Sequence, residues 1–125
     1  IDVIVSDHIP EDEESKRLPF SQAATGAIGI ETLLPLALEM YHNESLPLNK
    51  IIETLTINPA KILQINKGTL KKGSDGDICI LDLDAPWVVK AEKLKSKSKN
   101  TAIEGRKLQG KIIMTFLNGE QVFGQ

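Results

Sequence analysis

The sequence predicts an α/β chain in which one strand and a group of helices precede an all-β tail. A run of β-branched residues opens the chain at positions 1–6, and apolar residues at helical spacing follow between positions 30 and 63. After Gly68, glycines separate short strand-like segments and no further amphipathic helix is evident. A lone strand cannot bury itself, and a tail of short strands is marginal by itself. We therefore expect both halves to be pieces of a larger structure.

The opening run, Ile-Asp-Val-Ile-Val-Ser, is typical of a strand buried on both faces, as in a parallel sheet covered by helices. Pro10 should end this strand. A charged loop is expected over residues 11–20, and small residues with glycines fill positions 21–29. The chain has no initiator Met, so we expect it to begin within a longer protein.

Three helices are expected in the middle of the chain. The first covers residues 30–41 and has a broad apolar face, and the second covers residues 48–56. The third covers residues 58–63, with Asn58 as its N-cap and Pro59 in the first helical position.

The tail is expected to form short strands joined by turns and loops. Asn118-Gly119 between two apolar runs is a strong sign of a tight hairpin. The basic, polar stretch over residues 90–107 is expected to be a surface loop. The expected strands are residues 77–83, 87–89, 111–117 and 121–123.

Composition excludes several classes of protein. A length of 125 residues argues for one domain at most. With 15 basic and 17 acidic residues the net charge is -2, which gives no case for nucleic acid or an anionic membrane as partner. No segment approaches the roughly 18 apolar residues of a membrane span. The single cysteine, Cys79, excludes an internal disulfide and fits a reducing cytoplasm. Two histidines and one cysteine are too few for a self-contained zinc site.

Candidate chemistry lies where the first strand should end. Asp7 follows the apolar run, and a carboxylate at the carboxyl end of a parallel strand can bind a metal or accept a proton. Asp7 capping the next turn is the structural alternative. His8 is interpreted as a hydrogen-bonded neighbour of such a site rather than a ligand. The stretch 25–29, with Gly26 and Gly29, either presents backbone N–H groups to a ligand or forms a tight turn.

Six segments together resemble the cyclic amidohydrolases, and in particular the class I type of dihydroorotase. Residues 3–10 are similar to that family's last barrel strand, which ends in T-D-H-x-P. The others are residues 18–36 (P-F…G-x-x-G-x-E-T-x-L-P), 58–63 (N-P-A-x-I-L), 68–78 (G-x-L-x-x-G-x-D-A-D-L), and 98–101 with 110–119 at the family's end.

The resemblance implies a metal-dependent (β/α)₈ barrel beside a small β-sandwich. Residues 1–66 would be the C-terminal part of the barrel, with its last strand and helices, and residues 67–125 the C-terminal part of the sandwich. Such a barrel needs about 250 residues. A missing N-terminal barrel portion is therefore an expected partner, and it would supply most of the metal ligands.

The activity implied is the reversible hydrolysis of dihydroorotate to N-carbamoyl-L-aspartate in de novo pyrimidine biosynthesis, with one or two zinc ions. By resemblance, Asp7 would bind the metal and act as general base, and Glu11, Thr25 and Gly26 would stand at substrate-binding positions. Glu11 replaces a histidine that is common there, and an anion would repel the substrate carboxylate unless protonated or turned away. Thr25 stands where Phe is usual.

Two alternatives stay open at the level of sequence. One is a related cyclic amidohydrolase of the hydantoinase or allantoinase type. The other is a non-catalytic, dihydroorotase-like partner of aspartate carbamoyltransferase. In each case we expect a cytoplasmic protein with a small-molecule ligand, as a homo-oligomer or with the carbamoyltransferase. This chain alone should be inactive.

Overall fold

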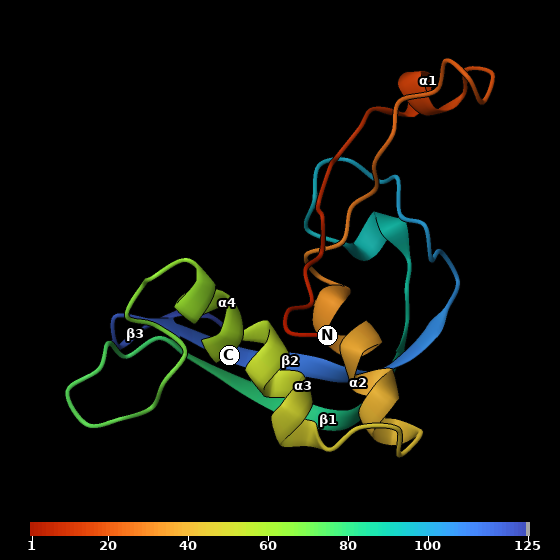
Figure 1. Ribbon diagram of the computed structural model, residues 1–125. Coiled ribbons are helices and arrows are strands. Elements are labelled where there is room, and N and C mark those ends of the chain that lie inside the picture. The colour runs from red at the N-terminus through yellow and green to blue at the C-terminus, as the bar shows by residue number, and fades with distance from the viewer. Residues whose placement is uncertain (125) are drawn as a thin grey trace.

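The computed structural model describes residues 1–124 and confirms an α/β chain (Figure 1). Helices occupy the first half and an antiparallel sheet the second. In chain order the elements are α1 (Glu13–Lys16), α2 (Leu33–His42), α3 (Leu48–Leu55), α4 (Ile57–Ile62), β1 (Ile78–Val88), the 3₁₀ turn η1 (Ala91–Lys93), β2 (Lys107–Leu117) and β3 (Glu120–Phe123).

Strand β1 is a single long strand where the sequence predicted two short ones. It pairs with β2 from Ile78, opposite Phe116, to Val88, opposite Lys107. The register shifts between Asp82 and Pro86. The Asp82 carboxylate accepts hydrogen bonds from the backbone N–H groups of the two residues that enter this irregularity, Asp84 and Ala85, each at 3.0 Å. The residues between the two predicted strands are thus included in one strand as a bulge.

The predicted hairpin is confirmed between β2 and β3. Asn118 and Gly119 both have positive φ, +51° and +83°, which is the requirement of the tight turn whose twist suits a hairpin. The turn also docks on the segment before β1. Gly119 N–H donates to the Gly76 carbonyl at 3.0 Å, and Asn118 N–H donates to the Asp77 carboxylate at 2.8 Å.

Helices α2 and α3 lie close to their expected positions. Helix α2 begins at Leu33 rather than at residue 30, because Thr32 and Leu33 first turn back on the Gly29 carbonyl through their backbone N–H groups. Pro35 then falls in the first turn, where its missing N–H costs nothing. Helix α2 packs on β2 and joins the helical layer to the sheet (Figure 1).

The predicted start of α4 is wrong. The helix begins at Ile57, so Asn58 lies inside its first turn and Pro59 is its third residue. The Asn58 side chain does not cap; it donates to the Asp2 carbonyl at 2.8 Å. The Asn58 amide, which the local sequence pattern predicted to cap the helix, therefore binds a segment 56 positions away instead.

The predicted strand over residues 1–6 is not formed. This segment makes a single backbone-to-backbone hydrogen bond with another part of the described chain, from Ile4 N–H to the Thr54 carbonyl at 3.2 Å. A ladder needs a neighbouring strand, and residues 1–124 place none beside it. The one strand-like pairing nearby is a parallel bridge between His8 and Ala27. The loop expected over residues 11–20 holds the short helix α1, capped by the Asp12 carboxylate.

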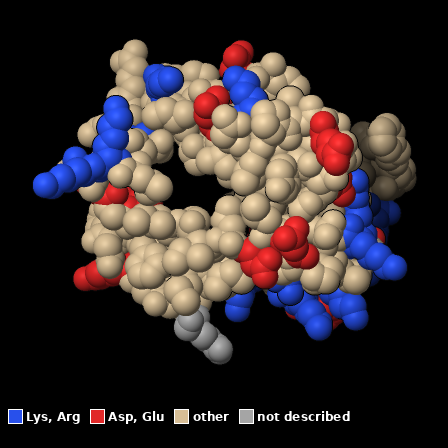
Figure 2. All heavy atoms as spheres, turned by 90° about the horizontal axis from the view of Figure 1, so that it is seen from below, with Lys and Arg blue, Asp and Glu red and all other residues tan. Residues whose placement is uncertain are grey.

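Burial is modest for a chain of this length. One cluster joins Ile28 to three residues of the second half, Val89, Leu94 and Leu108. Many large apolar side chains are exposed instead, among them Ile80 and Phe123 on the sheet. Figure 2 shows an opening through the molecule. Most of the surface in this view is uncharged, in agreement with the many exposed apolar side chains. Extended apolar surface of this kind indicates faces that bind other protein. In the described range, the helices lack the length and apolar character needed to cross a membrane.

Candidate functional site

Asp7 lies at a sharp bend that ends the extended segment. Its φ is +44°, in the left-handed region that aspartate tolerates better than most residues. The side chain is exposed and accepts no hydrogen bond from the turn that follows, within the part of the chain described. The cap suggested as the structural alternative is therefore not made. Both carboxylate oxygens are free to meet a cation or a proton.

A cavity of about 480 Å³ brings Asp7 together with the glycine-rich stretch. Its wall includes Asp7, Gly26 and Gly29, together with apolar side chains of α2. The sequence named Asp7 and Gly26 as site residues from segments nearly 20 positions apart, and the structure places them around one space.

The two glycines are needed because two backbone segments approach each other closely. Gly26 has φ +126°, and a Cβ there would lie 2.7 Å from the carbonyl oxygen of Ile9. A Cβ on Gly29 would lie 2.7 Å from the carbonyl oxygen of Ser6. Ile9 N–H also donates to the Ala27 carbonyl at 3.0 Å. The stretch is thus held against the segment that carries Asp7.

His8 is bound to the turn before α2. Its Nδ1 accepts hydrogen bonds from the backbone N–H of Gly29 at 3.0 Å and of Ile30 at 3.4 Å. An accepting Nδ1 leaves the proton of a neutral imidazole on Nε2. These bonds hold His8, the residue that follows Asp7, in place as a hydrogen-bonded neighbour.

Glu11 and Thr25 do not line the cavity that Asp7 lines. Thr25 is exposed, and Glu11 is half-buried with its backbone fixed at both ends. The Glu11 N–H donates to Asn100 Oδ1 at 3.4 Å, and the Glu11 carbonyl accepts from the Ser98 hydroxyl at 2.5 Å. The Glu11 carboxylate forms no ion pair with any residue in 1–124.

Sequence reasoning gave no role to three polar residues that organise this region. Asn100 Nδ2 donates to the Gly26 carbonyl at 3.2 Å, and Lys16 Nζ donates to the same carbonyl at 3.0 Å. The Glu31 carboxylate accepts from the backbone N–H groups of Lys95 and Ser96 at 2.8–3.1 Å. The available sign was that Glu31 and Asn100 lie in motifs of the resembled family; nothing local pointed to their partners.

The chain matches known proteins over almost its whole length. Residues 1–122 match the model of the amidohydrolase family. The chain belongs to the amidohydrolase family.

Among its relatives, the dihydroorotase of Ehrlichia chaffeensis (strain Arkansas) is 45% identical over 123 residues, covering 98% of this chain and 28% of that protein. The L-hydantoinase (dihydropyrimidinase) structure from Arthrobacter aurescens has 36% identity and a TM-score of 0.77 over 83% of this chain and 24% of its own. The dihydropyrimidinase structure from Brevibacillus agri NCHU1002, at 24% identity, shares the fold with a TM-score of 0.93, covering 99% of this chain and 28% of its own.

The resemblance to dihydroorotases noted in the motifs is thus confirmed across almost the whole of this amidohydrolase chain. The chain spans little more than a quarter of the length of the curated relatives it matches. Activity, substrate and metal content of the whole protein are therefore taken up below as proposals.

The residues of this amidohydrolase chain fit a metal only as part of a larger ligand set. Residues 1–124 hold no group of three His, Cys, Asp or Glu side chains that could bind an ion together. Asp7 is nevertheless exposed and lines a cavity, and its carboxylate is free of hydrogen bonds in the described chain. It has the oxygen chemistry of a metal ligand and would have to share the ion with residues outside this chain.

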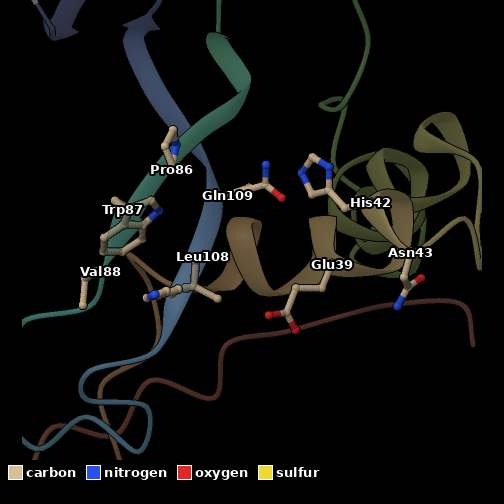
Figure 3. A pocket seen from close by; sticks show the side chains of 9 residues that line it. Glu39, His42, Asn43, Pro86, Trp87, Val88, Leu108 and Gln109 are labelled. Carbon is tan, nitrogen blue, oxygen red and sulfur yellow. The ribbon is translucent and has the colours of Figure 1, made fainter.

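A second cavity, of about 700 Å³, lies between α2 and the sheet and contains none of the candidate residues. Figure 3 shows the His42 imidazole and the Gln109 side chain facing each other across it. Glu39 forms an ion pair with Arg106 at 2.7 Å at its edge. His42 Nε2 is buried without a hydrogen-bond partner in the described chain.

A cluster of charged side chains lies where the chain enters β1. Lys67 Nζ lies 2.6 Å from a carboxylate oxygen of both Asp75 and Asp77. These hydrogen bonds raise the pKa of Lys67, with Asp75 contributing most. The backbone N–H of Asn118, and then the Lys67 ammonium, lower the pKa of Asp77. This cluster fastens the loop before β1 to the hairpin turn.

Proposed function

We propose that this chain is the C-terminal portion of a dihydroorotase, which interconverts dihydroorotate and N-carbamoyl-L-aspartate in de novo pyrimidine biosynthesis. The observation that carries the proposal is the cavity shared by Asp7 and Gly26 in a chain 45% identical to a dihydroorotase. Residues 1–66 would complete a (β/α)₈ barrel, and residues 67–125 a β-sandwich. The extended segment 1–6 supports this, because it has no ladder partner within residues 1–124 and the chain covers only 28% of that relative, so its neighbouring strands would lie outside this chain.

In the proposed reaction Asp7 moves a proton. The Asp7 carboxylate would help to hold zinc. The whole protein would bind one or two zinc ions, with the other ligands supplied by the N-terminal portion. Bound zinc would supply Lewis-acid chemistry. An oxygen of the Asp7 carboxylate accepts a proton from the attacking water as the water oxygen bonds to the ring carbonyl carbon. Asp7 then donates that proton to the ring nitrogen as the C–N bond breaks.

The surroundings of Asp7 assign the other roles. Gly26 lines the cavity, and its backbone N–H donates to no protein acceptor within residues 1–124, so it is available to a substrate oxygen. His8, held by Gly29 and Ile30, fixes the bend that follows Asp7. Glu11 does not line this cavity, which avoids the repulsion expected between its carboxylate and an anionic substrate. Thr25, exposed beside Gly26, would meet substrate only at the mouth of the site.

We further propose a cytoplasmic enzyme that works as a homo-oligomer or with aspartate carbamoyltransferase. The 125-residue chain alone should neither bind zinc tightly nor turn over substrate, because it provides a single candidate ligand among the described residues.

Two other functions remain as candidates. A hydantoinase-type enzyme is favoured by the likeness to the L-hydantoinase structure. A non-catalytic, dihydroorotase-like partner is favoured by Glu11, which stands where a substrate-binding histidine is common in active members.

A substrate panel on the full-length, metal-loaded protein separates these candidates. We expect ring opening of dihydroorotate at a kcat/KM at least tenfold above that for hydantoin, dihydrouracil and allantoin. A preference for hydantoin or dihydrouracil would favour the hydantoinase type. Metal-loaded protein that opens none of these rings, but co-purifies with aspartate carbamoyltransferase, would establish the non-catalytic alternative.

A further inference from the structure

We propose that Asn100 is a positioning residue, which holds the Gly26 loop in the arrangement that the substrate meets. This inference rests on the proposed function. Asn100 touches neither Asp7 nor the cavity, and it acts through Gly26 and Glu11.

The Asn100 carboxamide bridges two loops that are far away in sequence. Its Nδ2 donates to the Gly26 carbonyl at 3.2 Å, across 74 positions. Its Oδ1 accepts from Glu11 N–H at 3.4 Å, across 89 positions. Its backbone carbonyl accepts from Ile28 N–H at 3.2 Å. One side chain thus connects both loops that the sequence marked as substrate-binding.

Only an amide supplies this pattern at one position. It presents a donor to the Gly26 carbonyl and an acceptor to the Glu11 N–H. An aspartate of the same shape would keep the acceptor and place a second oxygen against the Gly26 carbonyl. A leucine of similar size would offer neither. Asn100 is half-buried, so water replaces these bonds poorly when they are lost.

Gly26 needs such support because its own backbone is permissive. A glycine at φ +126° has no Cβ to limit its conformations, and ordering it costs more entropy than ordering other residues. Hydrogen bonds to its carbonyl from Asn100 and Lys16 fix the Gly26–Ala27 peptide plane. Ile9 N–H fixes the next carbonyl, that of Ala27. These bonds fix the peptide plane that follows Gly26 and so limit the conformations of this glycine, which preorganises the backbone that lines the cavity.

The loop that carries Asn100 is anchored independently of these bonds. Leu94 is buried in the apolar cluster with Val89, and the Glu31 carboxylate holds the backbone of Lys95 and Ser96. Lys99 Nζ adds bonds to the carbonyls of Leu94 and Ser96. A change of the Asn100 side chain should therefore release the Gly26 loop while the Asn100 loop stays folded.

The test uses the full-length, metal-loaded protein with Asn100→Asp, with Asn100→Leu as an uncharged second variant in case the first fails to fold. Ser96→Ala is the matched control, because the Ser96 side chain makes no hydrogen bond within the described chain and its backbone bonds survive. We expect both Asn100 variants to raise KM for dihydroorotate about tenfold while kcat falls less than threefold, the pattern of a lost ground-state contact. Ser96→Ala should change neither.

Hydrogen exchange on the same proteins gives a readout that does not depend on turnover. We expect amide exchange over residues 24–28 to be at least tenfold faster in the Asn100 variants, with protection of β1 and β2 unchanged. An unchanged KM in an active enzyme, or unchanged exchange over residues 24–28, would overturn the role of Asn100 and leave the proposed function standing. Failure of the wild-type protein to open dihydroorotate would remove the proposed function, and the substrate role of Asn100 with it.

Discussion

The sheet and the candidate site are held together in different ways. The sheet is an antiparallel ladder with local register shifts, in which β2 and β3 are adjacent in sequence and joined by a two-residue turn. The site region has few regular elements, and side chains such as Asn100 and Glu31 bind backbone groups 64 to 89 positions away. A ladder of many backbone hydrogen bonds should tolerate a single substitution, whereas a loop held by a few side-chain hydrogen bonds should depend on each of those side chains. The predictions below test this difference in the full-length protein.

The largest effect is expected from Gly26→Ala. The new Cβ would lie 2.7 Å from the Ile9 carbonyl oxygen, on a residue at φ +126°. We expect a loss of about 3 kcal/mol or more in the free energy of unfolding, because overlap with backbone adds to conformational strain. Gly73→Ala is the control, since its φ is +89° but nothing lies within 4 Å of the added Cβ. Strain alone should cost it about 1 kcal/mol. Equal losses in urea unfolding would contradict the close approach of the two site segments.

A smaller effect is expected from Glu31→Ala. The change removes the acceptor for the backbone N–H groups of Lys95 and Ser96, so we expect a loss of about 1–2 kcal/mol. Glu120→Ala on β3 is the matched change in the sheet, because Glu120 is exposed and its carboxylate makes no hydrogen bond within residues 1–124. It should stay within about 0.5 kcal/mol of wild type. Thermal unfolding of both variants measures the difference in stability. Equal stabilities would mean that water replaces the Glu31 hydrogen bonds at no cost, which would contradict the expected role of Glu31.

Asn118→Ala tests whether a change in the hairpin turn affects the sheet alone or the site as well. Alanine tolerates the φ of +51° at this turn less well than asparagine, and the cost is about 1 kcal/mol. The loss should stay local. Faster hydrogen exchange is expected in β3, with no change over residues 24–28. Faster exchange in both regions would mean that the sheet and the site open together.

The smallest effect is a pH dependence at the cluster of Lys67, Asp75 and Asp77. The pKa of Asp77 is lowered in the folded protein, so its contribution is present at neutral pH and is lost as pH falls below about 4. The pKa of Lys67 is raised, so its contribution is present at neutral pH and lost as pH rises above about 10. Asp75 is exposed and Lys67 and Asp77 are only half-buried, so 1 M salt should weaken the effect. Asp77→Asn should flatten the acid limb of the stability profile; an unchanged limb would contradict the pairing.

Local patterns predicted the local structure well. Asn118-Gly119 predicted the hairpin, because a turn with two positive φ angles is specified by two adjacent residues. Helices α2 and α3 follow from apolar spacing within a few residues of their observed bounds. The start of α4 was missed because Asn58 binds the Asp2 carbonyl, a choice that depends on tertiary structure. The strand over residues 1–6 was predicted from a β-branched run, yet a strand exists only where a neighbour completes its ladder.

The candidate site was predicted in part. Asp7 was named as a candidate from its place at the end of an apolar run, and Gly26 from the resemblance to dihydroorotases; both line one cavity. Which candidates lie around one cavity is a matter of three-dimensional packing, and Glu11 and Thr25 prove to lie outside it. Asn100 and Glu31 could not be given partners from sequence, because their hydrogen bonds span more than 60 positions.

The most direct measurement is the steady-state kinetics of Asp7→Asn in the full-length, metal-loaded protein with dihydroorotate. Asp2→Asn is the control, an exposed carboxylate of the same segment whose side chain makes no hydrogen bond in the described chain. If Asp7 moves the proton, Asp7→Asn should lower kcat by about 10²–10⁴-fold, while Asp2→Asn stays close to wild type. An Asp7→Asn enzyme that retains more than a tenth of the wild-type kcat would contradict the assignment of Asp7 as the base.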